Sequence, residues 1–353
     1  MKYTTLIAFT LLVISIARAE WEFLANTEDM RLIQTDGSRL FASFERGLYT
    51  SHDQGNTWCT TALRPGGVEA IAVSGDTIYA SVYKQGIFRS DDYGVTWTPK
   101  NNGLHIIDDD TGEPLFLSID QILVARSGTV IAVGGFHGTY ISRDRGETWR
   151  FADDWLYPGA IDAAPDYPIS RNLDSMIEYE GHWWTAEWTQ VFRSPDEGST
   201  WEHLPELPRL GEAYDWAVLN KQLYVAGGHG FVRWNEADLA WDDLNNGLPD
   251  VPELSSLAVN RGRIFAAVFA SSMIGPGVHT TVPHGVYVFD EQSETWSPAG
   301  LQEFGVNSLV SHQSHLYAAA YARGKLSGIY RASIPIVHSY GKAPTTWGAI
   351  KTK

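Results

Sequence analysis

Four octads decide the fold of this chain: SHDQGNTW at 51–58, SDDYGVTW at 90–97, SRDRGETW at 142–149 and SPDEGSTW at 194–201. Each reads Ser-x-Asp-x-Gly-x-Thr-Trp, and two altered copies follow, WNEADLAW at 234–241 and FDEQSETW at 289–296. The copies recur every 40 to 55 residues or so, which is the size of a propeller blade and longer than a solenoid turn. The sequence therefore predicts a propeller built from repeated blades.

The residue types of the octad predict a tight turn. Ser and Asp side chains bind nearby backbone groups, and Gly adopts the positive φ that a chain reversal needs. The Thr-Trp pair then begins the next strand, with the indole covering the turn. The four octad aspartates are therefore predicted to be structural and not catalytic: Asp53, Asp92, Asp144 and Asp196.

Strand patterns surround each octad. A strand that opens with a small residue and an aromatic precedes it, as in GLYTS (47–51) and GIFRS (86–90), and apolar strands such as TIYASVY (77–83) lie upstream. Each unit is thus four short strands, named A to D in chain order. Counting the third strand yields seven units, the last without a fourth strand, and the aromatic segment EWEFL (20–24) has the character of the missing one. We predict an all-β, seven-bladed propeller of four-stranded blades, closed by the N-terminal strand.

The two ends differ from the repeat. Residues 1–19 combine Lys2, a short apolar run and an Ala-Arg-Ala site, which is typical of a cleaved signal peptide. The apolar run is too short to span a bilayer, and no later segment is long and apolar enough to do so. We expect a single propeller domain at 20–334 and a flexible tail at 335–353. Trp347 and Ile350 in that tail leave a docking or sorting role open.

The composition limits which classes of partner and which cellular compartment fit this chain. Cleavage after residue 19 removes two bases and no acid, leaving 24 bases against 42 acids and a formal charge of −18. This balance disfavours nucleic acid and membrane insertion. The single cysteine excludes an internal disulfide, and no N-glycosylation sequon is present. We expect a monomer that is secreted or periplasmic, with a bacterial source favoured.

The octads resemble the Asp-box (BNR) repeat of sialidase-like, sortilin-like and photosystem-assembly-factor-like propellers. The sialidase resemblance implies an arginine triad, a Tyr-Glu nucleophilic pair and an acidic Asp. Its F/Y-R-I-P motif is absent here, although Arg31, Arg46, Arg171 and Arg323 could reach the active face. The resemblance to sortilin-type and assembly-factor propellers implies a face that binds a protein or peptide.

Ligands of propellers normally sit on the face formed by the D–A and B–C loops. Alignment of the blades places one residue at each start of strand A on that face: Met30, Glu69, Asp120, Asp174, Asp215, Ser255 and Asn307. Carboxylates there could act as an acid/base pair or bind a divalent cation. The catalytic candidates are Glu69, Asp120, Asp174, Asp215 and Glu187. The alternative is that these residues cap strand ends or hold channel water.

The B–C loops supply the remaining candidates. A histidine precedes the glycine of strand C in three blades, which makes His137, His229 and His284 candidate metal ligands, or else solvated turn residues. The long connections 98–119, 150–173 and 270–284 also favour this face. The ligand-binding candidates are Trp155, Tyr157, Trp188, Arg46 and Arg323, because aromatic rings stack on sugars and peptides. They could equally well only cover the blade surface.

Two classes of function follow. The preferred one is an exported module that binds a glycan or a protein or peptide ligand, without a certain cofactor. The alternative is a carbohydrate-active enzyme, either a sialidase-like glycoside hydrolase or, with less support, a polysaccharide lyase. The octads identify the scaffold only, because fold does not imply function.

Overall fold

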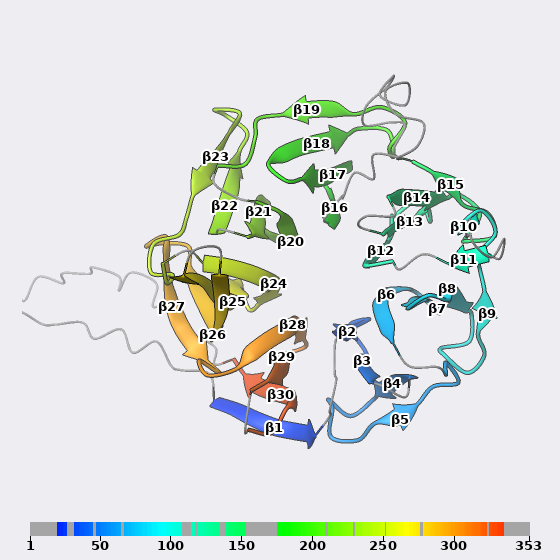
Figure 1. Cartoon of the computed structure of the whole chain (residues 1–353), viewed down its shortest axis with the longest axis horizontal. Coiled ribbons are helices and arrows are strands. Elements are labelled where there is room, and N and C mark those ends of the chain that lie inside the picture. Colours follow the sequence, from blue (N-terminus) through cyan, green and yellow to red (C-terminus); the bar gives the residue numbers. More distant parts are fainter. Residues whose placement is uncertain are drawn as a thin grey trace, which may run out of the picture.

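Seven antiparallel sheets of four strands surround one axis, as the computed structural model shows (Figure 1), and the protein is a seven-bladed β-propeller. The structure describes residues 20–26, 32–44, 47–64, 67–107, 114–116, 119–134, 138–152, 175–208, 211–228, 230–250, 252–275, 278–322 and 325–334. No helix occurs among these residues, so none of them forms a helix that could cross a bilayer.

The first four blades follow the chain in order. Blade 1 comprises β2 (Leu32–Thr35), β3 (Leu40–Phe44), β4 (Gly47–Ser51) and β5 (Cys59–Thr60). Blade 2 comprises β6 (Val68–Ser74), β7 (Thr77–Val82), β8 (Gly86–Ser90) and β9 (Thr98–Pro99). Blade 3 comprises β12 (Gln121–Val124), β13 (Val130–Val133), β14 (Thr139–Ser142) and β15 (Arg150–Phe151). Blade 4 comprises β16 (Ser175–Tyr179), β17 (His182–Glu187), β18 (Gln190–Ser194) and β19 (Glu202–Leu204).

The remaining blades complete the ring. Blade 5 comprises β20 (Ala213–Leu219), β21 (Gln222–Gly227), β22 (Gly230–Asn235) and β23 (Ala240–Asp243). Blade 6 comprises β24 (Pro252–Asn260), β25 (Arg263–Gly275), β26 (Val278–Asp290) and β27 (Thr295–Gly300). Blade 7 comprises β28 (Gly305–His312), β29 (His315–Tyr321), β30 (Gly328–Ser333) and β1 (Glu20–Asn26).

The predicted closure is confirmed. β1 pairs antiparallel with β30, from Glu20 opposite Ser333 to Asn26 opposite Gly328. The fourth strand of blade 7 therefore comes from the other end of the chain. This pairing removes the free edge that β30 would otherwise present.

The hydrophobic core lies between blades and not within them. Second strands such as β7, TIYASV, are buried at every position because each face packs against a neighbouring blade. Leu254 and Phe289 of blade 6, for example, share a cluster with Tyr224 and Phe231 of blade 5. Outer strands are short, and both residues of β5 are exposed. Each blade is thus stabilised mainly by its two neighbours.

The octads are the turns between the third and fourth strands, as predicted. In octad 51–58, Asp53 accepts hydrogen bonds from Thr57 N (2.8 Å), from Thr57 Oγ1 (2.7 Å) and from Ser51 Oγ (2.9 Å), and Gly55 N donates to Ser51 Oγ (2.8 Å). Gly55 has a φ of 83°. The other three octads repeat these bonds with Asp92, Asp144 and Asp196.

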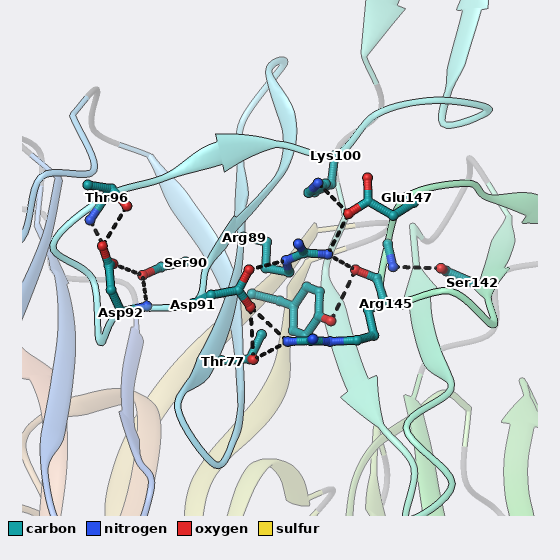
Figure 2. Close-up of polar contacts among 12 residues, drawn as sticks. Thr77, Arg89, Ser90, Asp91, Asp92, Thr96, Lys100, Ser142, Arg145 and Glu147 are labelled. Carbon is teal, nitrogen blue, oxygen red and sulfur yellow. Dashed lines mark hydrogen bonds and ion pairs between the residues drawn. The ribbon is translucent and has the colours of Figure 1, made fainter.

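Arginines in four of the third strands reach the octad of the next blade. In Figure 2, Arg89 of β8 donates to the Arg145 carbonyl oxygen (2.6 Å) and pairs with Glu147 (2.9 Å), both in the octad of blade 3. Arg193, Arg233 and Arg331 hold the same strand position and also reach the next blade: Arg193 pairs with Glu236, Arg233 with Glu294, and Arg331 donates to the Gln54 carbonyl oxygen.

Two long connections differ from the expected loops. Residues 270–284 belong almost entirely to a hairpin in which β25 and β26 extend beyond their blade, with Met273 opposite His279. Connection 98–119 contains a second small hairpin of β10 (His105–Ile107) and β11 (Pro114–Phe116). In the longer hairpin, the Val and Thr residues that begin β26 favour strand pairing once a partner strand is alongside, so this segment is not a loop despite its Gly and Pro residues.

Candidate functional site

The D–A and B–C connections lie at one end of all strands, and bulges shape the first strands at that end. The pairing register shifts at Glu69 in β6, at Ser255 in β24 and at Asn307 in β28. In blade 5 the shift occurs at Tyr214, so the blade alignment was displaced by one residue there. Asp215 consequently occupies the position that follows the bulge, together with Ser256 and Ser308.

This position after the bulge bridges neighbouring first strands. Ser308 Oγ donates to the Ile33 carbonyl oxygen (3.0 Å), and Ser256 Oγ accepts from Leu309 N (3.1 Å). Gln121 of blade 3 makes an equivalent bridge, accepting from Met176 N (2.8 Å). Side chains at this position therefore join the inner strands of consecutive blades, and Figure 1 shows these first strands arranged around the axis.

Asp215 makes the same bridge with a carboxylate. Its Oδ2 accepts from Leu257 N of blade 6 (2.7 Å), and its Oδ1 accepts from Trp216 N (2.8 Å). The side chain keeps a little solvent-accessible surface, yet so many protein atoms surround the carboxyl that desolvation raises its pKa to about 6, against the lowering effect of these hydrogen bonds. A carboxyl with that pKa is chemically suited to proton transfer near neutral pH.

The other described candidates occupy varied places. Asp120 is exposed and directly precedes β12, and its backbone N donates to the Val133 carbonyl oxygen (2.8 Å). Glu69 is half-buried at the bulge of β6. Glu187 ends β17, next to the turn that carries Trp188, which is 59% exposed with a positive φ of 56°. His284 lies half-buried at an irregularity of β26, and not in an open turn.

Seven candidates lie outside the described residues: Arg46, His137, Trp155, Tyr157, Asp174, His229 and Arg323. A metal site formed by His137, His229 and His284 therefore stays a prediction. Within the described ranges, no three His, Cys, Asp or Glu side chains are grouped as a metal site would require.

A groove between blades 6 and 7 opens on this face. It has a volume of about 520 Å³ and lies where the extended hairpin of blade 6 meets the first two strands of blade 7. Phe269, Pro283 and Tyr321 supply apolar walls, and an ion pair between Glu303 and Lys325 adds opposite charges. Sequence reasoning missed this groove, because the residues come from four separate segments and the hairpin was expected to be a loop.

Exposed apolar side chains also gather at this end of the strands. We call six of them the exposed apolar set, and each is between 39% and 59% exposed: Tyr83, Trp188, Tyr214, Val282, Tyr321 and Leu326. Its members belong to blades 2, 4, 5, 6 and 7, each in a B–C connection or at the end of a strand that leads into this face. Five other exposed large apolar side chains of the described residues lie elsewhere, and three of these are in octad turns: Tyr93, Val95 and Leu239.

The fold defines the class of protein: a seven-bladed β-propeller. No family model matches the sequence, and no curated protein is detectably similar to it. Among solved structures, YCF48 bound to D1 peptide superposes with a TM-score of 0.62 at 11% identity, covering 92% of this chain and 97% of that one.

Two larger proteins contain a similar propeller. The extracellular domain of BT4673 from B. thetaiotaomicron has a TM-score of 0.62 at 11% identity over 90% of this chain, which spans 40% of its length. The xyloglucanase of glycoside hydrolase family 74 from Xanthomonas campestris has a TM-score of 0.60 at 14% identity over 90% of this chain, which spans 54% of its length. At such low identity these likenesses establish the fold alone.

Proposed function

We propose that this chain is an exported binding module whose D–A and B–C face takes a protein or peptide ligand. The observation that carries the proposal is the groove between blades 6 and 7, whose Tyr321 wall belongs to the exposed apolar set on the same face. Aromatic anchors in and around a pocket provide most of the energy in peptide recognition. We also propose that the octads are Asp-box repeats and that residues 1–19 are a cleaved signal peptide.

The groove suits one apolar side chain of such a ligand. Its Phe269, Pro283 and Tyr321 walls would bury an aliphatic or aromatic group, and the Glu303–Lys325 pair would contact the ligand backbone or a charged neighbour. The comparison with peptide-bound YCF48 is consistent with this use of a single propeller.

Variants on the two faces test the proposal. Residues 20–353 would be screened against arrays of synthetic peptides and of glycans, and the strongest ligand would be titrated. Trp188→Ala and Tyr321→Ala should each weaken binding about tenfold or more, because anchor residues contribute at least about 1.4 kcal/mol. Leu239→Ala is the matched control, because Leu239 is 54% exposed in the octad turn on the opposite face. An equal loss of binding affinity in all three variants would contradict the proposed face. Binding to glycans and not to peptides would show that the ligand is a glycan.

A glycosidase is the second candidate, because the raised pKa of Asp215 is the kind of value a general acid needs. Glycosidase activity is measured directly as the release of reducing ends from mixed polysaccharides. Turnover that is lost in Asp215→Ser would establish the enzyme, whereas an inactive wild-type chain would remove this candidate.

A further inference from the structure

A second cavity, of about 750 Å³, lies between the outer strand of blade 1 and the octad turn of blade 2. Its walls include Thr50, Thr60 and Thr61 on one side and Tyr93 and Val95 on the other. Ala62 N donates to the Gly94 carbonyl oxygen (3.1 Å) and so fixes the two blades to each other beside it. This cavity is separate from the proposed ligand face and does not depend on it.

The cavity exists because one recurring interblade contact is missing here. Thr50 holds the position in the third strand where four other blades have an arginine that reaches the next octad. The octad position of Glu147, which receives Arg89, is Val95 in blade 2. The two remaining blades fill this strand position with Ile141 and Val288, both buried in interblade clusters. Only at this boundary of the seven is the position taken by a small polar residue.

Thr50 itself is left without a partner. Its side chain is only 8% exposed, and its Oγ1 is buried without a hydrogen bond in the wall of the cavity. A buried hydroxyl without a partner is costly, and the few that occur in native proteins call for an explanation such as a ligand. The missing arginine contact therefore leaves both a cavity and an unbonded hydroxyl at this boundary.

The charge of the cavity is the reverse of that of the whole chain. Arg39, His52 and Arg64 line it, and its described lining includes no Asp or Glu, although acids outnumber Lys and Arg 42 to 26 in the sequence. Arg39 is held by Asp36 (2.7 Å) and stacks on the Tyr93 ring at 4.4 Å, so it forms a fixed wall. Arg64 and His52 are exposed and remain to meet a ligand, with Arg64 Nη2 steadied by Thr60 Oγ1 (3.1 Å).

We propose that this cavity binds an organic carboxylate with an apolar or aromatic body. The carboxylate would lie toward Arg64 and His52, and the body would pack against Tyr93 and Val95. The volume lies within the range of small-molecule sites. An arginine fork with neighbouring hydroxyls is well matched to a carboxylate.

Benzoate and its neutral isostere benzamide test this site by calorimetric titration of residues 20–353. Benzoate should bind saturably, and benzamide should bind about tenfold more weakly or not at all. Thr50→Met introduces a side chain about as long as the arginine that four other blades carry, without its charge, so it should fill part of the cavity and weaken benzoate binding about tenfold or more. Arg64→Gln removes the cation without filling the space and should have a similar effect.

Arg126→Gln is the control, because the Arg126 side chain is 84% exposed on blade 3, away from the cavity. It should leave benzoate binding within about twofold of wild type. Equal binding of benzoate and benzamide would overturn the proposal, as would unchanged benzoate affinity in Arg64→Gln and Thr50→Met. Absence of saturable benzoate binding up to about 10 mM would also overturn it. A near-ultraviolet circular dichroism spectrum of each variant confirms that the fold is retained.

Discussion

Each octad aspartate is bound by several donors within its own turn. Backbone and side-chain hydrogen bonds from Thr57 lower the pKa of Asp53 to about 2. In Asp144, desolvation opposes the shift, but the bonds from Thr148 and Ser142 still lower the pKa to about 2. Because the folded pKa lies below the unfolded value of 3.8, these carboxylates stabilise the fold above pH 4. That contribution is lost as the pH falls from about 4 to about 2.

The octad serine is the buried member of this turn, and its removal provides the first stability test. Ser142 is 1% exposed, and its Oγ accepts from Gly146 N (2.7 Å). Ser142→Ala should lower the free energy of unfolding by about 1–3 kcal/mol, because it leaves that buried N–H without an acceptor. Ser199→Ala, in an exposed position of the next octad, should change it by less than about 0.5 kcal/mol. Denaturant unfolding measures both, and equal losses would contradict the assigned role.

Asp215 differs from the serines that bridge neighbouring first strands at the same position in the next two blades. Ser256 and Ser308 bridge to the next first strand without a charge, whereas Asp215 bridges with a carboxylate whose pKa is raised to about 6. A raised carboxyl pKa means that folding favours the protonated form. Its stabilising contribution is therefore complete below about pH 4 and is lost as the pH rises through 6.

Asp215→Ser should remove this pH dependence while keeping the bridge to Leu257. The variant should be more stable than wild type by about 2–3 kcal/mol at pH 7.5, since two pKa units correspond to roughly that free energy. The two proteins should differ little at pH 4. Urea unfolding across pH 4 to 8 measures the difference. Parallel curves for wild type and variant over that range would show that the Asp215 pKa is not raised.

At the scale of single elements, the short strand β1 contacts three different blades. Trp21 Nε1 donates to the Ala299 carbonyl oxygen of blade 6 (2.9 Å), and Phe23 packs edge-on against Tyr330 with ring centroids 5.3 Å apart. Leu24 contacts the cluster shared by blades 7 and 1. One strand thus joins three consecutive blades, and its pairing with β30 closes the ring.

Loss of a β1 side chain should accordingly destabilise the ring. Phe23→Ala should cost about 2 kcal/mol, because it opens a gap beside Tyr330. Glu22→Gln should cost less than about 1 kcal/mol, because Glu22 is exposed and its ion pair with Arg331 is solvated. Thermal unfolding gives both values, and hydrogen exchange should show faster exchange of β30 amides in Phe23→Ala only. A β1 that is not docked in solution would give equal, small effects.

At the scale of the whole molecule, the two ends of the propeller differ in kind. The octad end is held by repeated hydrogen bonds and interblade arginines, as Figure 2 shows at one boundary. The opposite end carries the exposed apolar set and the groove between blades 6 and 7. The contacts that repeat from blade to blade therefore build the scaffold. The candidate sites lie where one blade differs from the others. Thr50 and the extended hairpin of blade 6 are both such differences.

Much of the fold could be predicted from the sequence. The octads, the aromatic third strands and the EWEFL segment predicted seven blades and their closure, because these signals are local and the repeated ones recur at the spacing of a blade. The candidate site could be predicted less well from the sequence. Asp215 was placed one residue from its true register, because the bulge in blade 5 depends on pairing with β21 and leaves no mark in the sequence.

The sequence by itself determined the scaffold: turn chemistry within eight residues and alternating strand patterns are properties of neighbours along the chain. Tertiary structure alone decided which positions face a cavity. The groove beside Tyr321 and the cavity beside Thr50 each join residues from different blades, and their shape depends on side chains that pack across a boundary. Burial, and with it the raised pKa of Asp215, follows from that packing, since desolvation depends on every atom nearby and not on the residues adjacent in sequence.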